Sequence, residues 1–213
     1  MSLYSGTCVL LAGAVLAMAQ TSVEPDQSAP AAGLVRRPIT AEGRLKWFAI
    51  SSFGPASLAG GVISAAWGTM LNQPREYGPH WEGFGDRYGI RLTGVVTSNA
   101  MEAGLGALWG EDPRYPRATG QPVKKRIGQV IKMTFLAQDR NGRNMPAYAR
   151  YAANAGSNFL SNTWRERSEA DTEHAMGRIG LGFVARMAGN AFQEFWPDAK
   201  RLFRRGGSSP TPP

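Results

Sequence analysis

The stretch HWEGFGDRYGIRLTGVVTSNAMEAGLGALW, residues 80–109, decides the fold class of this chain. It contains no proline, and it lacks the strict alternation of polar and apolar residues that marks a half-buried strand. Pro79 stands directly before it, and Gly110 and Pro113 follow it, which is typical of a helix start and a helix stop. The stretch therefore predicts one long helix at the centre of a helical domain.

The same signals recur on both sides of this helix. Thr40 is expected to cap a helix over 41–53, and Pro55 to begin a second helix that ends near Asn72. Three further helices are expected over about 122–138, over about 146–164, and from 168 or 171 to about 195, with a kink or restart at Pro197. The sequence predicts an all-α bundle of five or six Gly/Ala-rich helices, with one helical domain over 40–205.

The composition fits one small domain and excludes several kinds of site. The chain has 213 residues, 43% of them hydrophobic, which is enough for a packed core. A single Cys excludes a disulfide framework, and two His residues leave no multi-histidine metal site to expect. We expect no cofactor, no metal and no catalytic site. The 24 Lys and Arg residues exceed the 16 Asp and Glu residues, for a net charge of +8.

The N-terminus resembles a secretory signal peptide over residues 1–19. An apolar core over 9–16 precedes Ala17-Met18-Ala19, a small-x-small cleavage site. The first seven residues carry no Lys or Arg, so an uncleaved membrane anchor is the alternative. Residues 20–39 have the composition of a flexible linker, and 206–213 that of a disordered tail. We therefore expect an exported protein of the periplasm or the membrane-associated envelope.

The stretch 47–71, which begins at Trp47 and ends at Leu71, contains no charged residue. Trp47 and Trp67 would lie about 30 Å apart along a helix, the thickness of a hydrocarbon core. Gly54-Pro55 interrupts the stretch, however, and the basic residues around it do not support the orientation expected after a cleaved signal. An integral protein that spans the membrane here is an alternative to a peripheral bundle.

Aromatic and basic side chains alternate near the C-terminus: Trp196, Lys200, Arg201, Phe203, Arg204 and Arg205. Aromatic rings can enter a membrane interface while the cations meet anionic headgroups. Lys124-Lys125-Arg126 forms a second basic cluster. The alternative for each cluster is a solvated helix end. We expect a membrane or anionic lipid surface as partner, with an envelope protein as a further candidate, and no nucleic acid.

Three side chains are candidates for acid–base chemistry. Glu102 interrupts an otherwise apolar helix and would need a partner when buried, for which Arg178 or Arg186 is available. His80 and His174 each have carboxylates nearby and could form an acid–base pair. Structural pairing of Glu102 and surface positions for both His residues are the favoured interpretations.

Four polar residues follow each other at steps of four: Arg150, Asn154, Asn158 and Asn162. This spacing places them on one face of a helix. The face is either a polar groove that binds a neighbouring helix or headgroup, or the solvent face of an amphipathic helix with Tyr148 and Phe159 packed on the other side. The solvent face is the favoured interpretation.

Small residues also recur four apart, as in Gly61 and Ala65 or Ala152 and Gly156. Such spacing favours close approach of helix backbones. The codon usage of a GC-rich genome explains the same composition equally well.

Three short motifs carry a resemblance to a known group of proteins. Residues 112–115 read Asp-Pro-Arg-Tyr, residues 139–142 form a polar Asp-x-x-Gly turn, and residues 194–198 read Glu-Phe-Trp-Pro-Asp. In these motifs the chain resembles an uncharacterised group of predicted bacterial exported proteins, over about residues 47–205. The resemblance implies export and one helical domain, and it carries no activity, cofactor or catalytic residue.

Together these features predict an exported, membrane-associated helical protein of the cell envelope with a structural or interaction role. One alternative is an envelope enzyme that acts on lipid or cell-wall material through Glu102 or a His–carboxylate pair. Another alternative is the integral protein that spans at 47–71.

Overall fold

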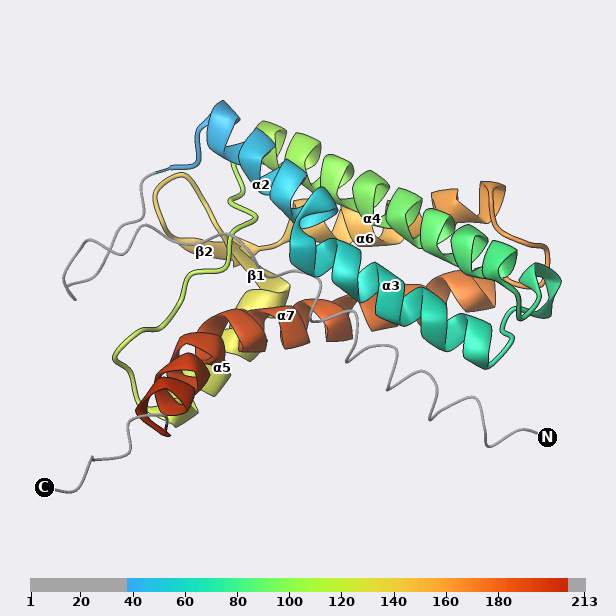
Figure 1. Ribbon diagram of the computed structural model, residues 1–213. Coiled ribbons are helices and arrows are strands. Elements are labelled where there is room, and N and C mark those ends of the chain that lie inside the picture. The colour runs from blue at the N-terminus through green and yellow to red at the C-terminus, as the bar shows by residue number, and fades with distance from the viewer. Residues whose placement is uncertain (1–37, 207–213) are drawn as a thin grey trace, which may run out of the picture.

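The computed structural model describes the backbone of residues 38–206 and the side chains of residues 38–201 (Figure 1). The expected signal peptide lies outside the described residues. So do most of the expected linker and all but the first residue of the expected tail.

Within the described part, the chain is an all-α bundle, as predicted. Its six α-helices are α2 (Ala41–Phe53), α3 (Pro55–Met70), α4 (Trp81–Trp109), α5 (Val123–Phe135), α6 (Tyr148–Leu160) and α7 (Thr172–Gly206). Two short 3-10 helices, η2 (Arg75–Tyr77) and η3 (Ser161–Thr163), lie in the connections.

The long helix α4 is the scaffold of the bundle. Helices α2 and α3 lie along it, and α6 packs against it as well (Figure 1). Helix α7 packs on α6 near Arg178 and Ile179, and on α5 from Phe183 to Asp198. Helix α5 therefore contacts the rest of the bundle mainly through α7.

Local signals set the helix ends where the sequence predicts them. The Thr40 hydroxyl accepts a hydrogen bond from the Gly43 N–H (3.0 Å), which caps α2. Gly54 is extended, with φ −66° and ψ 157°, and Pro55 occupies the first turn of α3. Gly110 ends α4 in the left-handed conformation, with φ 79°.

The prediction of helix over 136–138 is wrong. Helix α5 ends at Phe135, and β1 (Leu136–Gln138) pairs antiparallel with β2 (Asn144–Pro146). Between the strands, the Asp139 carboxylate accepts hydrogen bonds from the N–H groups of Asn141 and Arg143, both at 2.8 Å. Because these bonds stabilise a turn, the helix gives way to a hairpin.

Two other helix boundaries differ from the prediction. Helix α6 begins at Tyr148, not at Pro146, because Pro146 belongs to β2. Helix α7 runs through Pro197 to Gly206 as one element. It begins at Thr172, where the Asp171 carboxylate accepts a hydrogen bond from the His174 N–H (2.8 Å).

Glycine allows close helix packing at some of the repeated small residues. A Cβ atom at Gly61 would lie 2.7 Å from the Tyr88 ring, and one at Gly156 would lie 2.6 Å from Cε of Met101. Both contacts join helices of the bundle. Gly89 has open space around it, so the spacing by itself does not identify the contact positions.

The interior holds many polar side chains, and the surface many apolar ones. One apolar cluster joins Tyr115, Val130 and Met133 to α7. Charged groups are buried beside the small aliphatic core: Arg87, Glu102, Glu111, Asp112, Arg150 and Glu194. Because a buried charge is costly without a partner, the contacts of these groups determine how the helices assemble.

Candidate functional site

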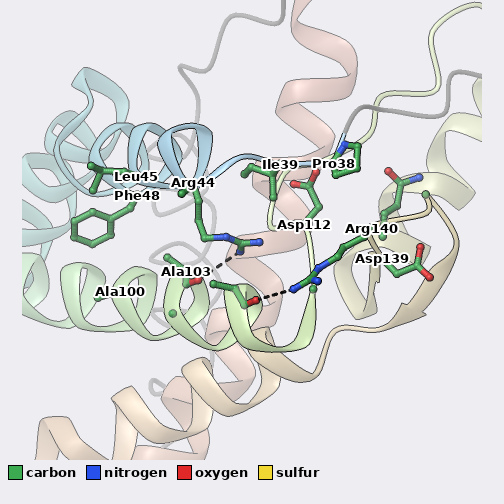
Figure 2. Close-up of a pocket in the computed structure, with 16 residues that line it drawn as sticks. Pro38, Ile39, Arg44, Leu45, Phe48, Ala100, Ala103, Asp112, Asp139 and Arg140 are labelled. Carbon is green, nitrogen blue, oxygen red and sulfur yellow. Dashed lines mark hydrogen bonds between the residues drawn. The ribbon is translucent and has the colours of Figure 1, made fainter.

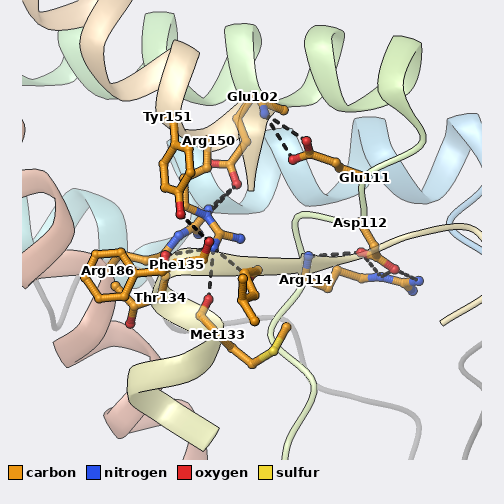
Figure 3. A network of polar contacts seen from close by, with 12 residues as sticks. Glu102, Glu111, Asp112, Arg114, Met133, Thr134, Phe135, Arg150, Tyr151 and Arg186 are labelled. Carbon is orange, nitrogen blue, oxygen red and sulfur yellow. Dashed lines mark hydrogen bonds and ion pairs between the residues drawn. The ribbon is translucent and has the colours of Figure 1, made fainter. Parts of the chain in front are cut away.

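Glu102 lies on the inner face of α4 and is only 7% exposed. Its Oε1 atom accepts a hydrogen bond from Nε of Arg150 on α6 (3.1 Å) and a second from Nη2 of Arg186 on α7 (Figure 3). The carboxylate therefore joins three helices. The expected contact with Arg186 is present.

Arg150 has a second set of contacts that no sequence pattern indicates. Its Nη1 atom donates to the carbonyl oxygens of Met133 (2.9 Å), Thr134 (3.0 Å) and Leu136 (3.2 Å), as Figure 3 shows. These carbonyls belong to the C-terminal end of α5, which carries a partial negative charge. Arg150 thus caps α5 and pairs with α4 at the same time.

Burial and a neighbouring positive charge both lower the pKa of one arginine in this network. Burial lowers the pKa of Arg186 to about 10, and the neighbouring Arg150 adds to that shift. Two guanidinium groups therefore share the single carboxylate of Glu102. This arrangement joins α4, α6 and α7 through one carboxylate.

Glu111 lies close to this network (Figure 3). Both of its carboxylate oxygens are 3.0 Å from the N–H of Ala149, in the first turn of α6. Burial raises the pKa of Glu111, while the bond from Ala149 partly opposes that shift. The side chain fixes the start of α6 against the end of α4.

Arg178 does not contact Glu102. It donates to the backbone carbonyl of Asn158 (3.2 Å) and to Oδ1 of Asn162. On α7 it lies eight residues before Arg186, which is about 12 Å along a helix. Arg178 therefore stabilises the contact between the end of α6 and the start of α7, away from Glu102.

The interpretation of the Arg150-to-Asn162 stripe as a solvent face is wrong. Arg150 is 7% exposed, and Nδ2 of Asn154 donates to the backbone carbonyl of Ile179 on α7 (2.9 Å). Tyr148 and Phe159, expected to pack inside, are 53% and 43% exposed. The stripe faces α4 and α7 because its donors meet carbonyl and carboxylate acceptors there.

The two histidines lie apart from Glu102. His80 is exposed at the start of α4. His174 is also exposed, and its Nδ1 atom lies 2.7 Å from Oδ2 of Asp171. The N–H of His174 lowers the pKa of Asp171, with help from the ring. Within residues 38–201, no three His, Cys, Asp or Glu side chains are grouped to hold a metal ion.

Another buried acid, Glu194, lies in the closing motif on α7 and is fully buried. Nε of Arg126 pairs with its Oε1 atom at 2.7 Å, and the Tyr115 hydroxyl donates to its Oε2 atom (3.1 Å). The Ala118 N–H donates to the same Oε2 atom (3.0 Å). Burial raises the pKa of Tyr115, and the nearby Glu194 charge adds to the shift.

The first motif of the sequence resemblance contacts the third and lies beside the second. Tyr115 of the first motif contacts Glu194 of the third. The Asp112 N–H donates to the carbonyl of Gln138 (2.9 Å), the residue before the Asp139 turn. These motifs form a polar framework that positions α5, α7 and the hairpin.

Helices α5 and α7 run antiparallel, which brings two basic clusters to one end of the molecule. Arg126 in the first turn of α5 pairs with Glu194 and, at 2.6 Å, with Asp198 near the end of α7. The start of α5 therefore lies beside the end of α7 (Figure 1). We call the exposed cations of these two segments the basic end: Lys124, Lys125, Lys200 and Arg201.

The aromatic residue of this region is also accessible. Trp196 is 40% exposed, stacks on Phe192, and has Nζ of Lys200 5.5 Å from its ring centre. Residues 203–205 continue α7, and their side chains, including Phe203, Arg204 and Arg205, lie outside the description.

An apolar stripe on α5 was missed by the sequence analysis. Its members are exposed and follow each other at steps of four: Val123, Ile127, Ile131 and Phe135. The four-residue spacing is the pattern from which this stripe could be predicted. The same segment contains Lys124, Lys125 and Lys132, as an amphipathic helix would.

The uncharged N-terminal stretch folds as two helices. Ala41–Met70 is long and apolar enough to cross a membrane by length and composition, and it is the one such stretch in the described part. A third of its most apolar window is buried inside the protein. Trp47 and Ala65 are buried, whereas Leu45 and Met70 are exposed.

Comparison with protein-family models, with curated proteins and with solved structures gives no match for this chain.

Proposed function

We propose that this protein is an exported, non-enzymatic helical protein of the cell envelope that binds anionic membrane surfaces through its basic end. The observation that carries the proposal is the antiparallel α5–α7 pair, in which Arg126 joins the start of one helix to the end of the other. Two cationic clusters that are far apart in the sequence thereby lie at the same end of the α5–α7 pair.

The apolar stripe of α5 supplies the second requirement for interfacial binding. Exposed aliphatic side chains enter the boundary between headgroups and acyl chains, while flanking lysines meet anionic headgroups. On α5, Val123 and Ile127 are exposed beside Lys124 and Lys125. Trp196 adds an accessible ring near Lys200.

Within the described residues, the groups named for the enzyme alternative do not gather in one place. That alternative needs a cleft that gathers Glu102, His80 or His174, and the described residues place the two histidines at exposed, separate positions. The Glu102 carboxylate forms ion pairs with Arg150 and Arg186. A role in binding or structure accounts for these contacts.

Vesicle sedimentation tests the membrane proposal. Each basic residue near an anionic surface contributes about 1 kcal/mol. Changing all four residues of the basic end to Gln should therefore weaken binding to phosphatidylglycerol-containing vesicles by at least tenfold. Neutral phosphatidylcholine vesicles should bind the unchanged protein weakly.

A control variant with the same change in net charge tests whether the position of the cations matters. It replaces four exposed cations elsewhere with Gln: Lys46, Arg75, Arg143 and Arg167. Both variants lose four positive charges, and the control should bind within about twofold of the unchanged protein. Equal losses would mean that binding follows net charge alone. Unchanged binding of the first variant would exclude the basic end.

Export is tested on the protein from its native host. Mass spectrometry of the mature N-terminus should find Gln20, and carbonate washing should release the protein from membranes. An intact Met1 with retention in the pellet would instead favour the spanning alternative at 47–71.

A further inference from the structure

We propose that the cavity between α2 and α4 binds a single-chain anionic amphiphile, a long-chain carboxylate, with its chain along α4 and its headgroup at Arg44 and Arg140. The cavity has a volume of about 590 Å³. This lies within the range of sites for one small organic ligand, and it suits one acyl chain better than two.

The cavity wall on α4 is made of small residues. Ala100, Ala103, Gly104 and Ala107 line it in succession, and Gly110 closes the row. This row extends about 15 Å along the helix axis. A Cβ atom at Gly104 would meet nothing within 4 Å, so the space beside it is open. Short side chains thus leave a trough in which a linear chain can lie.

The cavity is polarised along its length (Figure 2). Leu45 and Phe48 of α2 and Ala100 of α4 line one end. At the other end, Arg44 and Arg140 point toward α4 (Figure 2). An apolar end and a charged end match the two parts of an amphiphile.

The two arginines are bonded only to backbone carbonyls within the described residues. Arg44 donates to the carbonyls of Glu111 (2.8 Å) and Ala103 (3.4 Å). Arg140 donates to the carbonyl of Ala107 (3.3 Å). A guanidinium has five N–H donors, so both side chains keep donors for a ligand.

Two carboxylates also line this end, and each is paired with another arginine. Asp112 accepts from Nε (2.9 and 3.1 Å) and Nη2 (2.6 Å) of Arg114. Asp139 pairs with Arg143 at 3.2 Å and accepts backbone N–H groups of its own turn. The charge left for a ligand is therefore positive, which selects an anionic headgroup.

The site is distinct from the basic end. Its charged end is formed by α2 and the β1–β2 turn, whereas the basic end belongs to α5 and the end of α7. The protein can therefore fail to bind vesicles and still bind the ligand, or the reverse, so the two proposals are tested independently.

Binding is measured with a fluorescent palmitate analogue in solution, below its micelle concentration. The Gly104→Leu variant should bind at least tenfold more weakly, because its side chain fills the trough. The control is Gly94→Leu on the same helix, where a Cβ atom also meets nothing within 4 Å. The proposal would be overturned if the Gly104→Leu and Gly94→Leu variants bound the palmitate analogue with equal affinity.

Headgroup recognition is tested in the same assay. Arg140→Gln should weaken binding several-fold, whereas Lys46→Gln, which removes an exposed cation of α2 that does not line the cavity, should not. Palmitate should displace the probe at least tenfold better than hexadecanol, and acetate should not displace it. Equal displacement by hexadecanol, or displacement by phosphatidylglycerol vesicles but not by palmitate, would overturn the assignment of a single-chain anion.

Discussion

Replacing Glu102 with Gln tests whether the buried carboxylate holds the three helices together. The amide keeps the size of the side chain and one acceptor oxygen, but it removes the negative charge. Arg150 retains its three carbonyl acceptors at the end of α5. Arg186 loses the ion pair that compensates its charge, with a side chain only 14% exposed.

The size of the effect follows from this difference. Removing one partner of a buried ion pair costs about 3–5 kcal/mol, because the other charge stays buried. Since Arg150 keeps other acceptors, we expect the lower end, about 3 kcal/mol. A chain of this size loses roughly 2–4 °C in Tm for each kcal/mol, so Tm should fall by about 6–12 °C.

Urea unfolding followed by circular dichroism measures the change in the free energy of unfolding. The control is Glu82→Gln, the same replacement at an exposed position of α4, which should cost less than about 1 kcal/mol. The double variant Glu102→Gln/Arg186→Met removes the uncompensated cation and should recover about half of the loss. A Glu102→Gln variant as stable as the control, or a double variant less stable than the single one, would refute this reasoning.

Three further predictions concern other parts of the molecule. Because burial raises the pKa of Glu111 above its ordinary 4.5, the folded chain holds this proton more tightly than the unfolded chain, and the stability linked to it falls as pH rises through the folded-state pKa. Urea titrations from pH 4 to 7 should show a smaller loss with rising pH for Glu111→Gln; an identical profile would contradict the shift. A Cβ atom at Gly83 would lie 1.9 Å from the Tyr77 carbonyl oxygen, so Gly83→Ala should lower the free energy of unfolding by more than about 2 kcal/mol, whereas Gly94→Ala should raise it by up to about 1 kcal/mol. The Ile127→Asn/Ile131→Asn variant should keep its Tm within a few degrees, because both side chains are about half exposed, and it should bind anionic vesicles about tenfold more weakly than the unchanged protein. Unaltered vesicle binding would remove the α5 stripe from the membrane surface.

The sequence alone determined the helical class and most helix starts, since these depend on residues close together in the chain. Thr40, Pro55 and Gly110 act on backbone groups within one turn, so their effect is visible in a short window. A charge inside an apolar helix also indicated in advance that Glu102 would need a partner.

Only the tertiary structure decided which partners these groups have. The contact of Arg150 with the end of α5 depends on where a distant helix stops, and it reverses the expected orientation of the whole Asn stripe. The short hairpin escaped prediction because three-residue strands carry too little periodicity to be distinguished from a helix end. The basic end and the α2–α4 cavity likewise arise from packing of segments far apart in the sequence. They form where buried charges on one helix are paired with groups on another helix. A pattern within one short segment cannot predict such pairing.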